Sequence, residues 1–190
     1  MDNKIGDAGL IFMKVGLHAQ EDIEDIVKRK QREFEQAGSI FWGYGGTTCH
    51  PLTMVQPFAR EIEETGNEVL IVMHKMNSKH SAPPVVAKEY SDDGVNWQPI
   101  PEGIEVRGSR CALVLDELRI DDFEIDLSDL EVGIGPSRGR RADRYLIGRA
   151  DKGCFRYSPR TTLVAPDERV TKRIGLVARA KAPFAVFVRN

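Results

Sequence analysis

The segment GSIFWGYGGTTCHP, residues 38–51, sets the expected order of helices and strands. Gly38 is suited to end a helix, residues 39–44 are apolar enough to form a strand, and Pro51 is suited to a first helical position. The segment also holds three aromatic residues and three glycines after Gly38. Glycine lets a backbone approach another group closely, and aromatic rings supply flat apolar walls. We therefore interpret this segment as the border of a ligand pocket.

One helix is expected before this segment and one after it. The first covers residues 18–38, where acidic residues precede basic ones and apolar residues recur at helical spacing: Ile23, Ile26, Val27 and Phe34. The second runs from Pro51 to about Gly66 and has its own apolar stripe: Val55, Phe58, Ala59 and Ile62.

Most of the remaining chain has the pattern of strands separated by turns. Strands are predicted at residues 9–16, 39–44, 68–74, 85–91, 95–100, 104–107, 110–115, 161–165, 174–178 and 184–188. The acidic residues 116–132 are expected to form one or two edge strands or an irregular connection. Two early helices followed by many strands predict an α+β fold with a curved, largely antiparallel sheet that forms a partly closed barrel. We expect one ligand-binding domain in residues 1–157, and a basic extension, residues 158–190, packed on it.

The composition is typical of a globular protein with no membrane partner. The chain has 190 residues, of which 41% are hydrophobic and 29% charged. It contains no apolar run long enough to span a bilayer and no signal-peptide core at its start. Three widely spaced cysteines (Cys49, Cys111, Cys154) favour reduced thiols and a cytoplasmic location. The CxxC and HxxxH pairs of zinc sites, the Walker motif and the dinucleotide fingerprint are absent, so we expect no metal and no cofactor.

The net charge of -2 conceals a strong asymmetry along the chain. Residues 137–190 carry 14 Lys and Arg against 4 Asp and Glu, whereas the excess in residues 1–136 is acidic. One interpretation is an anionic partner, either nucleic acid or a phosphorylated small molecule. The other is that the basic segment packs against the acidic one.

The order of elements resembles that of PUA-like domains, in particular the EVE and ASCH type. The resemblance covers roughly residues 9–157 and rests on four features: an opening strand LIFMKVG, an early helix, the Phe41-Trp42-Gly43 loop, and later strands at 68–72 and 85–91. It implies a pocket bordered by the aromatic and glycine-rich loop. It also implies recognition of RNA or modified bases.

The expected ligand-binding residues are Phe41, Trp42, Gly43, Tyr44, Gly45, Gly46 and Thr47. A flat ligand needs aromatic faces for stacking, and backbone amides or hydroxyl groups that recognise its edge. Along a strand Phe41 points away from Trp42 and Tyr44, so only one of these sets can line the pocket. The alternative is that Phe41 and Trp42 are core residues.

A second candidate site is the glycine-rich segment 133–139 together with the arginines that follow it. The expected phosphate-binding residues are Ser137, Arg138, Arg140, Arg141 and Arg144. Glycine-rich backbone before a helix can present amides to an anion, and arginine adds bidentate charge. The alternative is a surface turn with solvated arginines.

Three functions are compatible with the sequence. The leading hypothesis is a binding domain that recognises a nucleotide or a nucleic-acid base. The second is a small enzyme acting on a nucleotide or phosphorylated substrate, with Cys49 or His50 as catalytic candidates. The third is a protein-interaction scaffold, in which the acidic residues 116–131 and the basic C-terminal segment are faces for association, including that of a homo-oligomer.

Overall fold

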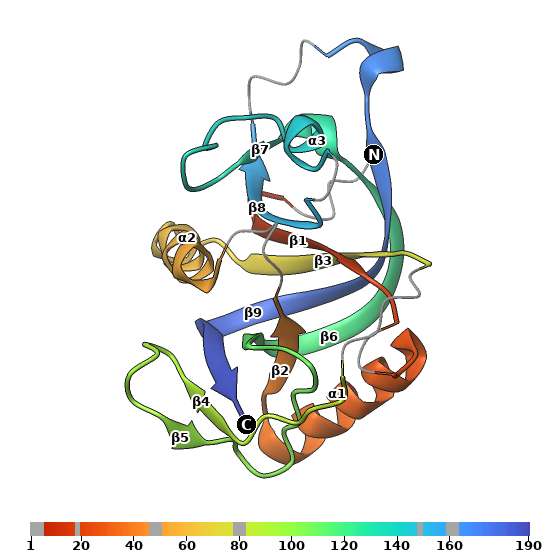
Figure 1. Cartoon of the computed structure of the whole chain (residues 1–190). Helices are drawn as coiled ribbons and strands as arrows, with labels where there is room; N and C mark the ends of the chain where they lie inside the picture. The colour runs from red at the N-terminus through yellow and green to blue at the C-terminus, as the bar shows by residue number, and fades with distance from the viewer. Residues whose placement is uncertain (1–5, 18–19, 46–50, 78–82, 148–149, 159–163) are drawn as a thin grey trace.

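The computed structural model describes residues 6–17, 20–45, 51–77, 83–147, 150–158 and 164–190 (Figure 1). Its three α-helices in these residues are α1 (Ile23–Ala37), α2 (Leu52–Glu64) and α3 (Ala142–Tyr145). Its strands are β1 (Gly9–Val15), β2 (Ile40–Tyr44), β3 (Val69–Lys75), β4 (Glu89–Ser91), β5 (Gln98–Pro99), β6 (Cys111–Asp126), β7 (Leu130–Val132), β8 (Lys152–Tyr157) and β9 (Thr171–Arg189). The prediction of an α+β fold with two early helices is confirmed.

One large mixed sheet contains all the described strands. Its order is β2-β6-β9-β3-β1-β8-β7, and β4 pairs with both β5 and β9. β1 and β3 run parallel, joined by a crossover that contains α1, β2 and α2, and the other described strand pairs are antiparallel. In the described part of the chain no pairing joins β2 to β7. The sheet is open, so the expected partly closed barrel is not confirmed.

The two longest strands, β6 and β9, lie side by side and bend together (Figure 1). Cys111 is paired with Phe187 near one end and Asp126 with Thr171 at the other, and three register shifts bend the ladder. The sequence predicts edge strands or an irregular connection for residues 116–132. Residues 116–126 continue β6, with β9 as their one partner among the described strands, and residues 130–132 form β7 at one end of the sheet order, so the expectation of edge strands is confirmed. The predicted strands 174–178 and 184–188 are two parts of one strand, β9.

Opposite charges explain how such an acidic strand can pair. Arg173 of β9 donates to Asp122 of β6, with Nε 2.6 Å from Oδ1. Arg179 of β9 similarly donates to Asp116 of β6, with Nε 2.8 Å from Oδ1. Cross-strand pairs of opposite charge stabilise a sheet, whereas like charges would repel. These contacts support the interpretation that the basic segment of the chain packs against the acidic one.

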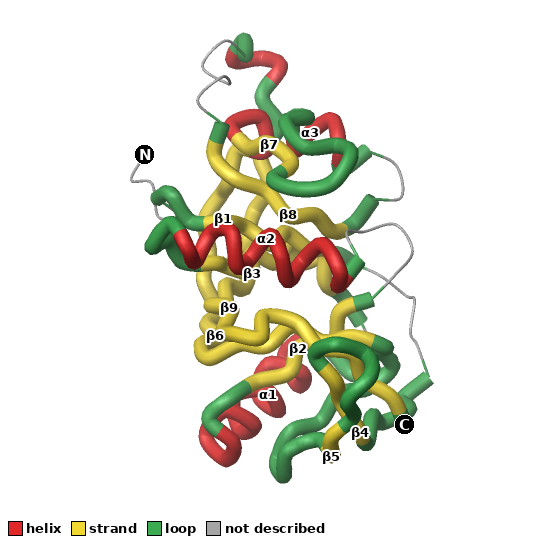
Figure 2. Tube along the Cα trace, turned by 90° about the vertical axis from the view of Figure 1, so that its left-hand side faces the viewer, coloured by secondary structure: helices red, strands yellow, loops and turns green. Residues whose placement is uncertain are grey.

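The apolar side chains of the described residues form three cores, and β1 lies between two of them. Ile11 and Met13 of β1 belong to the core that includes the buried faces of α1 and α2. Leu10 and Phe12 point to the opposite face, into the core beside α3. Figure 2 shows α2 lying over β1 and β3, while α1 lies near β2. No helix in the described residues is long and apolar enough to cross a membrane.

The hairpin formed by β4 and β5 turns around Asp93. Its Oδ1 accepts hydrogen bonds from the backbone N–H groups of Asn96 at 2.8 Å and Val95 at 2.7 Å, and from the hydroxyl of Ser91 at 2.8 Å. These bonds hold the pKa of Asp93 well below its ordinary value of 3.8. The predicted turn at residues 92–94 therefore depends on an ionised carboxylate.

We expect Asp93→Ala to lower the melting temperature at neutral pH. Because the pKa is lowered in the folded state, the carboxylate contributes fully above pH 3.8 and loses its contribution as the pH falls toward the folded-state value. Thermal unfolding at several pH values should show the difference from the unaltered protein shrinking only below pH 3.8. Asp92→Ala is the matched control, since the Asp92 side chain has no hydrogen bond with the described residues. Equal losses for the two variants would contradict this account.

Candidate functional site

A pocket of about 450 Å³ lies where α1, the carboxyl end of β1, β2 and residues 106–110 meet. Part of its wall is apolar, and the larger side chains there are Met13, Val15, Ile23, Ile26, Trp42 and Met76. Basic side chains also line it: Lys14, Arg29, Lys30, Arg107, Arg110 and Lys152. The acidic lining residues are Glu21 and Asp151. The pocket therefore combines an apolar surface with an excess of positive charge.

Two glycines of the segment 38–51 shape one wall. A Cβ atom on Gly43 would lie 2.7 Å from Ser109 Oγ, so any larger residue there would require the Ser109 hydroxyl to move. A Cβ atom on Gly45 would meet no described atom within 4 Å. At Gly45 the wall is thus formed by backbone, with no described side chain packed where a Cβ atom would lie.

The structure divides the predicted ligand-binding residues. Trp42, Gly43 and Gly45 line the pocket, although Trp42 is only 5% exposed. Phe41 points to the opposite side of β2, where its ring meets Tyr90 edge-on at 5.3 Å between centroids. Tyr44 is fully buried in the core.

Alternation along β2 explains why Phe41 faces away from Trp42 and Tyr44, as the sequence predicts for a strand. The remaining residues of the predicted set, Gly46 and Thr47, lie outside the described residues, as do the catalytic candidates Cys49 and His50.

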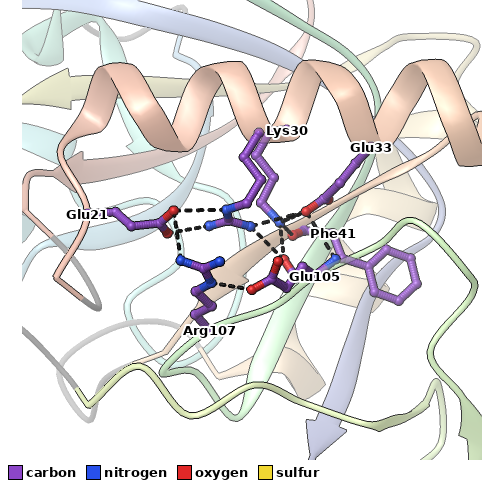
Figure 3. Close-up of polar contacts among 7 residues, drawn as sticks. Glu21, Lys30, Glu33, Phe41, Glu105 and Arg107 are labelled. Atoms are coloured by element: carbon purple, nitrogen blue, oxygen red, sulfur yellow. Dashed lines mark hydrogen bonds and ion pairs between the residues drawn. The ribbon is translucent and has the colours of Figure 1, made fainter.

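Beside the pocket, a network of charged residues ties α1 to β2 and to residues 105–107 (Figure 3). Lys30 is its centre: Nζ donates to Glu33 Oε1 at 2.8 Å and Oε2 at 2.9 Å. It also donates to the backbone carbonyls of Phe41 at 2.6 Å and Glu105 at 2.5 Å. Glu33 in turn accepts from the backbone N–H of Glu105 at 3.0 Å. Lys30 and Glu33 therefore supply the partners that the neighbouring backbone needs.

Two arginines complete the network. Arg29 forms a bidentate contact with Glu21 at 3.1 and 2.6 Å, and contacts Glu33 at 3.1 Å. The guanidinium group of Arg107 lies 3.0 Å from the carboxylate of Glu21, and its Nε donates to the carboxylate of Glu105. Arg29 lies four residues before Glu33 on α1, and Lys30 lies three residues before it. Both spacings bring a basic side chain within reach of the Glu33 carboxylate on a helix.

The positive and negative side chains of the network balance one another, and the pKa values of Lys30, Glu33 and Glu105 are shifted in different directions. Burial lowers the pKa of Lys30 to about 8 and raises the pKa of Glu33. The hydrogen bond from Arg107 lowers the pKa of the Glu105 carboxyl. Three basic and three acidic side chains face one another here (Figure 3), so this part of the pocket wall carries little net charge for a ligand.

The positive charge available to a ligand comes from the other side of the pocket. Lys14 Nζ donates to the backbone carbonyl of Ala150 at 3.2 Å and forms no ion pair with the described residues. Arg110 is exposed and likewise has no ion pair among them. Lys152 pairs with Asp151 at 3.1 Å. Lys14 and Arg110 are therefore the two lining cations that an anion can approach without displacing a carboxylate.

None of the predicted phosphate-binding residues lines this pocket. Arg138 pairs with Glu61 at 2.6 Å, while Arg141 and Arg144 both approach Asp143. Arg140 is exposed, and Ser137 lies in the same turn. Phosphate binding by this segment stays a prediction.

Sequence reasoning missed Lys14 and Arg110 as site residues. Lys14 gave a signal, because it is the one charged residue in the apolar run GLIFMKVG. Arg110 belongs to the sequence RGSR, whose significance depends on the approach of residues 107–109 to β2, a contact between distant parts of the chain.

Within the described residues, no group of three or more His, Cys, Asp or Glu side chains is placed to hold a metal ion. Compared with models of known families, with curated proteins and with solved structures, the chain matches none of them.

Proposed function

We propose that this protein binds a nucleotide or a nucleic-acid base in the pocket between α1, β1, β2 and residues 106–110. The observation that carries the proposal is that Lys14 and Arg110, which have no ion pair among the described residues, line the pocket beside an apolar wall that includes Trp42. A base would contact the apolar wall and a phosphate would approach Lys14 and Arg110. Charge-assisted hydrogen bonds from lysine and arginine are the usual means of holding phosphate.

The size of the pocket fits this class of ligand. Sites for small molecules measure about 300 to 1,000 Å³ and combine apolar walls with a few polar groups. The volume of about 450 Å³ falls within that range. The backbone at Gly43 and Gly45 adds surface that a flat ring can approach closely.

The resemblance to PUA-like domains supports the same ligand class. That resemblance implies a pocket beside the aromatic and glycine-rich loop, and three residues of the loop line this pocket. A PUA-like, partly closed barrel and a cytoplasmic location are parts of the same proposal.

The test is calorimetric titration with nucleoside monophosphates, comparing the unaltered protein with Arg110→Glu. One charge-assisted hydrogen bond contributes about 1.5 to 3 kcal/mol, so reversing this charge should weaken binding by about tenfold or more. Raising the salt concentration should also weaken binding, because the attraction between the phosphate and the pocket cations is screened.

Arg140→Glu is the matched control, because it makes the same change of charge at an exposed arginine outside the pocket. Its affinity should equal that of the unaltered protein. If Arg140→Glu weakens binding and Arg110→Glu does not, the ligand binds at the 133–144 segment and the pocket proposal fails.

A further inference from the structure

The basic residues that follow the acidic part of the chain are largely neutralised at the surface. Seven described arginines from residues 138–189 each lie within 3.0 Å of a carboxylate oxygen: Arg138, Arg141, Arg156, Arg169, Arg173, Arg179 and Arg189. Their partners come from α2, β4, β6, β7, and residue 143. The count of Lys and Arg along residues 137–190 therefore overstates the positive charge that a polyanion would meet at the surface.

Exposed cations without an ion pair among the described residues are dispersed over the fold. Outside the pocket they are Arg32 on α1, Arg60 on α2, Lys88 before β4, Arg140 before α3 and Lys181 on β9. A groove for single-stranded nucleic acid needs neighbouring cations that follow the backbone for several nucleotides. Each of these five residues comes from a different element or connection, which does not favour such a groove.

Stacking surfaces for successive bases are equally sparse. Among the described residues, the two aromatic side chains that are exposed are Phe34 on α1 and Tyr157 on β8. Neither lines the pocket, and the two come from separate elements. Trp97 is covered by Arg189, whose guanidinium carbon lies 3.9 Å from its ring centroid. The described part of the surface therefore offers a strand of nucleic acid no series of rings on which its bases could stack.

Within the pocket, by contrast, Lys14 and Arg110 remain available beside the apolar wall. We infer that the ligand is a free mononucleotide, held at its one anionic end by Lys14 and Arg110, and not a nucleic-acid chain. This inference rests on the proposed function and narrows its ligand class. A monophosphate fits this inference because the two cations match one phosphate and the apolar wall matches one base.

The experiment is a titration series in which only the length of the ligand changes. The probes are a nucleoside 5′-monophosphate and 5′-phosphorylated oligoribonucleotides of the same base, from a dinucleotide to a dodecanucleotide. We expect the monophosphate to bind at least as tightly as any oligonucleotide. The salt dependence of the affinity should not steepen with length, because no further phosphates are contacted.

Two variants locate the contact. Arg110→Glu should weaken binding of the monophosphate about tenfold, as one charge-assisted contact predicts. Arg173→Glu should leave it unchanged, because Arg173 lies on β9 outside the pocket and its charge is already balanced by Asp122.

An affinity that rises tenfold or more with length, together with a steeper salt dependence, would overturn this inference. If Arg110→Glu still weakened binding in that case, the proposed pocket would stand and only the ligand class would change. Absence of binding by every member of the series would instead overturn the proposed function, and this inference with it.

Discussion

Replacing Lys30 with methionine is expected to lower the free energy of unfolding by about 3 to 5 kcal/mol, because it removes one member of a buried ion pair and leaves the other in place. The Lys30 side chain is 3% exposed and that of Glu33 is 2% exposed. The substitution also takes a donor from the carbonyls of Phe41 and Glu105. Urea unfolding followed by circular dichroism would measure the loss.

A neighbouring lysine provides the control. Lys28 is 66% exposed and lies 3.8 Å from Asp25, so Lys28→Met should change the free energy of unfolding by less than about 1 kcal/mol. The double variant Lys30→Met/Glu33→Leu should lose less than the sum of its single changes, since neither charge is then left alone. Similar stabilities for Lys28→Met and Lys30→Met would contradict the role given to the network.

The same substitution should change how stability depends on pH. The pKa of Lys30 is about 8 in the folded protein, below the ordinary value of 10.5, because burial disfavours the charged form. Between these two values the unfolded chain binds the proton more tightly, so Lys30 makes the free energy of unfolding rise with pH. The stability difference between the unaltered protein and Lys30→Met should therefore increase across this window. A constant difference would contradict the lowered pKa.

Replacing Trp42 with alanine is the second change for which we expect a large effect, a loss of about 3 to 5 kcal/mol in the free energy of unfolding. On the sequence hypothesis, Trp42→Ala tests base stacking in a pocket. In the structure Trp42 is 5% exposed and belongs to the main apolar core. The substitution would leave a cavity there, and urea unfolding would detect it directly.

Trp97→Ala is the matched comparison. Trp97 is half-buried on the β4–β5 hairpin and is covered by Arg189, so its loss should cost about 1 kcal/mol, mainly a cation–π contact. If the two tryptophan variants were equally stable, Trp42 would not be a core residue. Loss of ligand binding in Trp42→Ala cannot separate contact from unfolding, and for that reason the charge variants are the better test of the pocket.

Local sequence patterns were sufficient to predict the first half of the fold. β1, α1, β2, α2 and β3 all lie within a few residues of their predicted positions, because apolar periodicity, Gly38 and Pro51 act over short distances. The path of residues 116–126 could not be predicted in this way. Their strand depends on partners such as Arg173 and Arg179, more than 50 residues away in the chain.

The same limit applies to the candidate site. The glycines at 43 and 45 were identified because the conformational freedom of glycine is visible in the sequence itself. Lys14 and Arg110 could not be identified in this way. They line the same pocket as β2 only after the crossover from β1 to β3 and residues 106–110 have come together in the fold. Counting charge along the chain also gave no indication that most of the later arginines have carboxylate partners.

The position of β9 has a consequence for how the chain folds during its synthesis. β9 separates β6 from β3 in the sheet, yet it follows all the other described strands in the sequence. Until residues 171–189 leave the ribosome, β6 and the β3–β1–β8–β7 group have no strand between them, and their facing edges expose unpaired backbone N–H and C=O groups. The nascent chain can therefore complete this sheet only after residues 171–189 have been made. Contacts between such distant segments form slowly, and the unpaired strand edges are prone to aggregation until they do.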